Sequence, residues 1–134
     1  MKCVIVLDEA LPVGLLANTA AVLGLSLGNH VAELIGPDII DSDGLMHKGI
    51  TAVPIPILAA DRDTLKSLYV TAMEEGKELQ VIGFNTTAQQ CHHYELYSQT
   101  MMQKSVDELD YLGVCIYGPK KIINRLCGQL KLLR

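Results

Sequence analysis

The 134-residue chain has the length of one domain, and its composition of 49% hydrophobic and 19% charged residues argues against disorder. Its formal net charge of −4 argues against a general nucleic-acid-binding surface. The charge is unevenly distributed along the chain, because residues 119–134 hold five basic side chains and no acidic one. We therefore expect a single domain spanning residues 1–134, with room for at most a local anion site.

Targeting and membrane signals are weak in this sequence. The first apolar run, Cys3–Leu7, ends at Asp8, which is too short for a signal peptide, and residues 11–27 are interrupted by polar and helix-breaking residues. The four cysteines contain no C-x-x-C pair, so we expect reduced thiols and no zinc site. The sequence thus predicts a cytoplasmic protein with no membrane contact, no metal and no cofactor.

The first half of the chain predicts a strand, a long helix and an irregular excursion. Lys2–Leu7 is a continuous apolar, β-branched run, as expected for a strand covered on both faces. Val13–Leu27 is rich in alanine and leucine and predicts a helix packed closely on a sheet, ending at Gly28. Within residues 29–50 the turn signal Asp41–Gly44 separates short apolar segments, which favours an irregular excursion or a small hairpin.

The next strand, Thr51–Ala59, contains two prolines two residues apart. Pro54 and Pro56 remove neighbouring hydrogen-bond donors from one side of the strand, so we expect an edge strand. Asp61 then caps a helix that closes at Gly76. Its apolar positions follow the helical repeat: Leu65, Leu68, Tyr69, Ala72 and Met73.

Alternating strands and helices continue to the end of the chain. Leu79–Phe84 and Leu109–Tyr117 read as strands. Between them, the capping-box pattern Thr87-Ala-Gln-Gln90 predicts one helix reaching about Asp107. A last helix opens after Gly118-Pro119. The order β-α-β-α-β-α-β-α predicts a three-layer α/β/α domain with a four-stranded sheet.

Both ends of this pattern resemble the type 2 peptidyl-tRNA hydrolases, in the segments KCVIVLDEALPVGLLANTAAVLG and LGVCIYGPKKIINRLCGQLKLL. The middle resembles a more specific relative, the uncharacterised domain-of-unknown-function family numbered 2000, in IGPDIIDSDG and in the proline-containing strand before Ala59-Ala60-Asp61. The resemblance implies a mixed sheet of strand order 2-1-4-3 in which strand four is antiparallel. It also places strand two at an edge.

The chain departs from the hydrolase pattern where that family carries its chemistry. The hydrolases open the first helix with a Lys-Gly-Lys-like segment and follow strand three with an aspartate-containing loop. Here residues 12–18 read PVGLLAN, with no lysine, and residues 83–90 read GFNTTAQQ, with no aspartate. The groups that polarise an ester or activate a water are therefore missing, and we do not expect peptidyl-tRNA hydrolysis.

The leading functional hypothesis is a non-catalytic domain that binds a small polar ligand. In open α/β sheets, ligands bind beyond the carboxyl ends of parallel strands. That crevice would gather hydrogen-bonding side chains beside the acidic turn Asp8-Glu9: Asn18, Thr19, Asn85, Thr86 and Thr87. The structural alternative is that these side chains only cap helices and satisfy backbone groups.

The second hypothesis is an enzyme acting on a small polar or nucleotide-derived substrate, with Cys91, His92 or His93 as the reactive group. We expect these three residues in the first turn of a helix, where a thiol is activated, although spacing with Tyr94 favours a buried cysteine. Neighbouring helical residues diverge by about 100°, so the two histidines do not share a metal readily.

The third hypothesis is a dimeric protein-interaction module. Tyr94, Tyr97, Met101 and Met102 suit an adaptable interface, although helical spacing places most of them in a core. The apolar residues on several faces of the helices lead us to expect a homodimer. Separately, Lys120 and Lys121 lie in the first turn of the last helix, where a bound anion would be favoured, on a surface apart from the crevice.

Overall fold

The computed structural model describes residues 1–134 and contains a five-stranded mixed sheet of order β5-β6-β1-β4-β7. Its strands are β1 (Lys2–Asp8), β4 (Ile57–Ala60), β5 (Gln80–Asn85), β6 (Tyr111–Gly118) and β7 (Lys131–Leu132). β1 pairs in parallel with β4 and antiparallel with β6, and β6 pairs antiparallel with β5. The mixed sheet and the antiparallel direction of the strand around residues 109–117 are confirmed.

The predicted four-strand order is corrected by a strand that the sequence did not reveal. Lys131–Leu132 pair antiparallel with β4, so β4 lies inside the sheet and the prediction of an edge strand there is wrong. The proline argument fails because both prolines precede β4, which starts at Ile57. Its backbone thus remains free to pair on both sides, and the carbonyl of Ile57 accepts a hydrogen bond from the amide of Leu133 at 2.9 Å.

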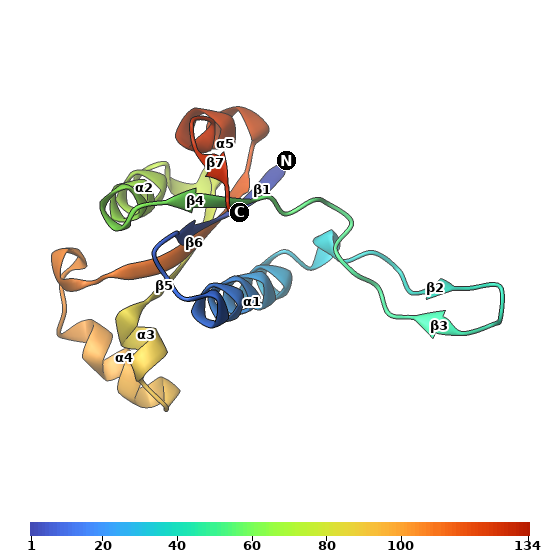
Figure 1. Cartoon of the computed structure of the whole chain (residues 1–134), viewed down its shortest axis with the longest axis horizontal. Coiled ribbons are helices and arrows are strands. Elements are labelled where there is room, and N and C mark those ends of the chain that lie inside the picture. Colours follow the sequence, from blue (N-terminus) through green and yellow to red (C-terminus); the bar gives the residue numbers. More distant parts are fainter.

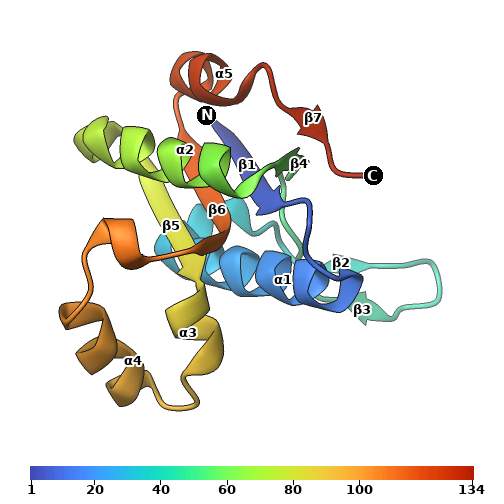
Figure 2. The same ribbon diagram turned by 60° about the vertical axis from the view of Figure 1, so that its left-hand side comes forward.

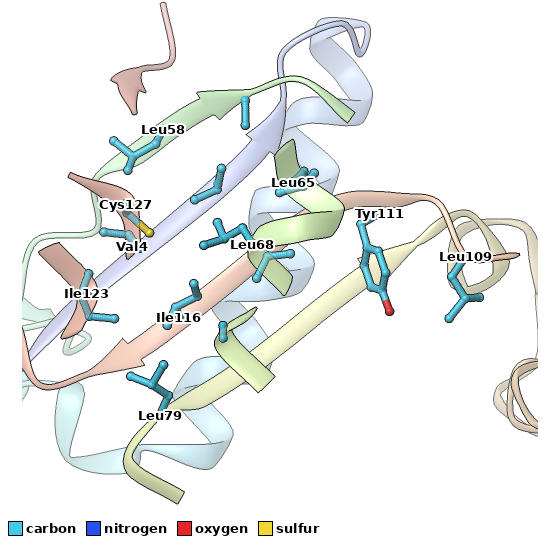
Figure 3. Close-up of a cluster of buried hydrophobic side chains, with 14 residues drawn as sticks. Val4, Leu58, Leu65, Leu68, Leu79, Leu109, Tyr111, Ile116, Ile123 and Cys127 are labelled. Atoms are coloured by element: carbon cyan, nitrogen blue, oxygen red, sulfur yellow. The ribbon is translucent and has the colours of Figure 1, made fainter. Parts of the chain in front are cut away.

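Helices cover both faces of the sheet, so that helices, sheet and helices form three layers (Figure 1). α1 (Val13–His30) packs on one face, around a core that includes Ile5, Leu23 and Phe84. α2 (Arg62–Glu74) and α5 (Lys120–Cys127) pack on the other face. Figure 3 shows the core beneath them, which the sheet and both helices form together with Leu79 and Leu109 from the segments that precede β5 and β6. The labelled side chains are those of Val4, Leu58, Leu65, Leu68, Leu79, Leu109, Tyr111, Ile116, Ile123 and Cys127.

The start and end of α2 follow the local sequence signals. The carboxylate of Asp61 accepts a hydrogen bond from the amide of Thr64 at 2.8 Å, which is the expected N-cap. That hydrogen bond holds the pKa of Asp61 below its ordinary value. Gly76 has a φ of +76°, which glycine adopts without strain, and it opens the short 3-10 helix η2 (Gly76–Glu78). Both predicted boundaries are confirmed.

Between α1 and β4 the chain leaves the body of the domain and returns (Figures 1 and 2). After the 3-10 helix η1 (Ala32–Leu34), the strands β2 (Ile39–Ile40) and β3 (Met46–His47) pair antiparallel. The turn between them is held by the carboxylate of Asp41, which accepts hydrogen bonds from the amides of Asp43 and Leu45. Of the two structures predicted for this segment, the small hairpin is the one observed.

The segment between β5 and β6 is not one helix. It holds α3 (Thr86–Gln90), α4 (Tyr94–Met102) and the 3-10 helix η3 (Val106–Glu108). The backbone is extended at Cys91 and at His93, which separates α3 from α4. The predicted cap is also displaced: the side chain of Asn85, and not Thr87, accepts the hydrogen bond of the first turn, from the amide of Ala88 at 2.9 Å.

Candidate functional site

A groove of about 470 Å³ lies between α1, β5 and the α3–α4 segment. Its walls are mainly apolar, with three hydroxyls, a thiol and two imidazoles among them. The lining residues are Val22, Leu23, Ser26, Ile82, Gly83, Phe84, Ala88, Cys91, His92, His93, Tyr94 and Tyr97. Since small-molecule sites usually occupy about 300–1,000 Å³ and are mostly apolar, this groove has the size and character of one.

Two walls of the groove are formed by a helix and a strand, in which regular spacing places the lining residues on one face. Val22 and Ser26 are four residues apart in α1 and therefore share one face of the helix. Ile82 and Phe84 are two residues apart in β5 and point to the same face of the sheet, toward α1. The third wall comes from the break between α3 and α4, which turns residues 91–93 across the open side.

Two tyrosines give this third wall a defined shape. The rings of Tyr94 and Tyr97 meet edge to face, with centroids 5.4 Å apart and an interplanar angle of 81°. Burial, together with Tyr94, raises the pKa of the Tyr97 hydroxyl above its ordinary value, so that hydroxyl remains a hydrogen-bond donor. No aspartate, glutamate, lysine or arginine lines the groove. These features favour a flat ligand of low charge.

The polar residues expected to bind a ligand flank the groove without lining it. Asn18 is exposed on α1, whereas Thr19 is fully buried and its hydroxyl has no hydrogen-bond partner. The methyl group of Thr19 faces Gly113 of β6, because a Cβ added to that glycine would come within 2.7 Å of it. The structure therefore places Thr19 in the helix–sheet interface.

The second group of predicted ligand-binding residues supports the α3–α4 segment. Asn85 is buried, caps α3 and directs its amide toward the sulfur of Met101 at 3.6 Å. The hydroxyl of buried Thr87 accepts a hydrogen bond from the ammonium of Lys104 at 3.1 Å. Thr86 is half-buried at the start of α3. The hydrogen bonds of Asn85 and Thr87 are internal, and a ligand-binding role for the five residues stays a prediction.

Cys91, His92 and His93 do line the groove, but they do not occupy the first turn of a helix as expected. They form the extended connection between α3 and α4, so the helix-terminus activation argued for the thiol does not apply. Both histidines are exposed, and Cys91 is half-buried. No three histidine, cysteine or acidic side chains in the structure are grouped so that they can hold a metal ion.

The four thiols differ in accessibility, and this difference predicts one reactive cysteine. Cys3, Cys115 and Cys127 are buried. The hydrogen bond with Cys3, together with burial, raises the pKa of Cys115, and burial raises that of Cys127 to about 11. We expect one equivalent of iodoacetamide to react with the folded protein, at Cys91, and four after unfolding. Mass spectrometry of the alkylated peptides checks this, and early labelling of Cys127 would contradict it.

Lys120 and Lys121 are exposed at the start of α5 and face away from the groove, because α5 covers the opposite side of the sheet from α1. The expectation that most of the Tyr–Met cluster is core is wrong for two of its members. Tyr94 and Met102 are largely exposed on α4, a helix with no buried residue. The break after Gln90 moves this helix off the sheet, so its apolar side chains remain on the surface.

The family model of a protein of unknown function, DUF2000, matches residues 1–134. The chain belongs to the DUF2000 family. No curated protein sequence matches this DUF2000 chain. Among solved structures, the protein of unknown function Atu0240 from Agrobacterium tumefaciens strain C58 is similar in fold, with a TM-score of 0.88 and 21% sequence identity. The match covers 98% of this chain and 96% of that one.

Sequence reasoning located one wall of the groove and missed the others. Cys91, His92 and His93 were predicted as site residues because they carry reactive groups. Val22, Ser26 and Phe84 carry no such signal and were predicted only as parts of a helix and a strand. The available signal was the spacing of residues in α1, because Asn18, Val22 and Ser26 follow one another at intervals of four and so lie on one face of the helix.

The chain contains no helix with the length and apolar character required to cross a lipid bilayer.

Proposed function

We propose that this DUF2000 chain is a small-ligand-binding domain without a catalytic role, and that its ligand occupies the groove between α1, β5 and the α3–α4 segment. The observation that carries the proposal is the lining of the groove. Apolar side chains from a helix and a strand form two walls, and a few hydrogen-bonding groups converge from the third. This combination is typical of sites that bind small organic molecules.

The lining also favours a class of ligand. The edge-to-face pair of Tyr94 and Tyr97 presents aromatic surface on which a flat ring can pack. His92, His93 and Ser26 supply hydrogen bonds, whereas no side chain of fixed charge is available to neutralise several phosphates. We therefore expect a heteroaromatic or similar small molecule with few charges, and not a nucleoside triphosphate.

The resemblance to the type 2 peptidyl-tRNA hydrolases supports the non-catalytic part of the proposal. The resemblance implies pairings of β4 with β1, β1 with β6 and β6 with β5, which occur here, whereas β7 gives the sheet a fifth strand that the resemblance does not imply. Residues 12–18 open α1 without a lysine, so the cation expected from that family has no counterpart there. A hydrolase-like arrangement of strands with a different site would account for both observations.

An enzymatic alternative rests on the presence of Cys91, His92 and His93 in one groove. Such an enzyme would need the thiol held beside a base that a third group orients. Here both imidazoles are exposed on an extended connection. A Cys91 that is alkylated many times faster than a free cysteine would favour the enzyme; an ordinary rate would favour the binding domain.

The proposal is tested by a thermal-shift screen of heteroaromatic compounds, followed by calorimetric titration of the hits. Removing the aromatic wall with Tyr97→Ala should weaken binding by about tenfold or more, since a buried aromatic ring contributes about 1.5–3 kcal/mol. Filling the groove with Ser26→Phe should abolish binding. His30→Ala, on the exposed end of α1, is the matched control and should leave the affinity unchanged.

One further variant distinguishes the groove from the polar crevice predicted from sequence. Asn18→Ala removes an exposed amide one turn from Val22 without touching the groove lining. Unchanged affinity in this variant agrees with binding in the groove. Affinity that is lost with Asn18→Ala, and kept with both Tyr97→Ala and Ser26→Phe, would place the ligand in the crevice and contradict the proposal.

A further inference from the structure

The side of the domain that carries α1 has an unusual concentration of exposed apolar residues. Sixteen large hydrophobic side chains of the chain are exposed, and nine of them lie within residues 13–50. Residues 13–50 contain α1, η1 and the hairpin formed by β2 and β3. Figures 1 and 2 show the hairpin projecting from the body at the level of α1, on the side of the sheet that α1 covers.

The outward face of α1 is an apolar ridge. Val13, Ala17, Ala21 and Leu25 follow one another at intervals of four residues, and all four are exposed. Val13 is 81% exposed and Leu25 is 80% exposed, so the chain itself covers little of either residue. The two alanines between them leave room for another backbone to approach closely. A helix face that contacts only solvent normally carries polar and charged residues, so this apolar ridge indicates a face that contacts something else.

The charge pattern separates α1 from the other surface helices. Residues 13–29 contain no aspartate, glutamate, lysine or arginine, whereas α2 and α5 carry exposed charges such as Arg62, Asp63 and Lys121. In a two-fold interface the same patch meets itself, and residues near the axis meet their own copies. Charges there would face like charges at a cost, but a neutral apolar ridge fits its own copy.

The hairpin adds a second apolar element that the chain does not cover. With Ile50, which follows β3, the hairpin has five large apolar side chains, each at least 60% exposed: Ile39, Ile40, Leu45, Met46 and Ile50. A two-stranded hairpin of this size is marginally stable alone. Its base is tied to the domain by a hydrogen bond from the amide of Ala52 to the carbonyl of Leu34, at 2.7 Å. The hairpin is therefore held in place without being packed.

We propose that the outward face of α1 and the β2–β3 hairpin together form the surface on which a second copy of this chain docks, in a two-fold symmetric homodimer. The area agrees with this partner. Seven side chains, those of Val13, Leu25 and the hairpin five, expose on the order of 500 Å² of apolar surface at roughly 75 Å² each. A standard interface buries about 800 Å² per partner, of which about 60% is apolar, and so needs about the same.

The homodimer is tested by light scattering coupled to size-exclusion chromatography on the full chain, at about 50 µM protein. The native chain should elute with the mass of two copies. Leu25→Glu on the ridge and Ile40→Glu on the hairpin should each raise the dimer dissociation constant by about a hundredfold, because each substitution occurs twice in the dimer. The double variant should be a monomer. Both positions are exposed, so far-UV circular dichroism should show unchanged folding.

Met73→Glu is the matched control, since Met73 is an exposed apolar residue of α2, on the opposite side of the sheet. It should leave the dimer intact. A single-chain mass for the native protein would overturn the proposal and redirect the surface to a different partner. A double variant that still dimerises, or a Met73→Glu variant that dissociates equally, would also overturn it. None of these outcomes depends on a ligand in the groove, so the two proposals fail separately.

Discussion

Leu65→Ala should lower the free energy of unfolding by about 3 kcal/mol, within the range of about 2–5 kcal/mol for buried leucines. Leu65 is 0% exposed and lies in the first turns of α2, where it packs into the core between this helix and the sheet (Figure 3). Truncation removes apolar contacts and leaves a cavity that the rigid β1 and β6 cannot fill. The loss is large compared with the usual total stability of such a domain, about 5–15 kcal/mol.

Urea denaturation followed by circular dichroism measures this change as a shift of the midpoint at constant slope. Leu96→Ala is the matched control, because Leu96 also lies in a helix, α4, but is 46% exposed. Its cost should stay below about 1 kcal/mol, since surface truncations remove few contacts. Equal costs for the two leucines would mean that α4 is packed as firmly as α2, contrary to the burial seen here.

The sequence predicted the elements whose signals are local. The apolar run of β1, the Asp61 cap of α2 and the turn at Asp41–Gly44 each depend on neighbours within a few residues. Such signals survive folding because no distant contact opposes them. The two sides of the sheet could be anticipated as well, since the strands and helices alternate along the chain.

Elements that depend on distant partners were not predictable in the same way. β7 has two residues, and only its pairing with β4 makes it a strand. A pattern of such length carries no periodicity, so the strand became visible only with its partner in place. The single helix expected between Thr87 and Asp107 failed for a related reason. Residues 91–93 have no proline or glycine to mark a break, and yet their backbone is extended at both ends.

The candidate site shows the same division between residue chemistry and geometry. Reactive side chains identified Cys91, His92 and His93, and these residues do line the groove. Hydrogen-bonding side chains identified Thr19, Asn85 and Thr87, which instead are buried between α1 and β6 or support the α3–α4 segment. Type and position along the chain cannot distinguish a polar residue that faces a ligand from one that completes a helix cap. Burial decides between them.

Gly113 illustrates how closely α1 approaches the sheet beside this site. A Cβ at Gly113 would lie 2.7 Å from side-chain carbons of Leu7 and of Thr19, and 3.0 Å from one of Leu23. All three side chains are at most 1% exposed, so they can move aside only by displacing other buried side chains. Leu23 also lines the groove. The absence of a side chain at residue 113 therefore sets the separation of helix and sheet on which the groove depends.

Gly113→Val should consequently lower the free energy of unfolding by about 3 kcal/mol, the upper part of the usual range for overpacking, and Gly113→Ala by about half as much. Valine favours strands, so propensity alone predicts a gain. Gly24→Ala provides the opposite sign: its Cβ would meet nothing within 4 Å, and in the middle of α1 alanine should stabilise by about 0.5–1 kcal/mol. Thermal and urea unfolding of the three variants measure these differences. If both alanine variants stabilised the protein, α1 would have to lie farther from β6 than described, and the groove beside Leu23 would be wider.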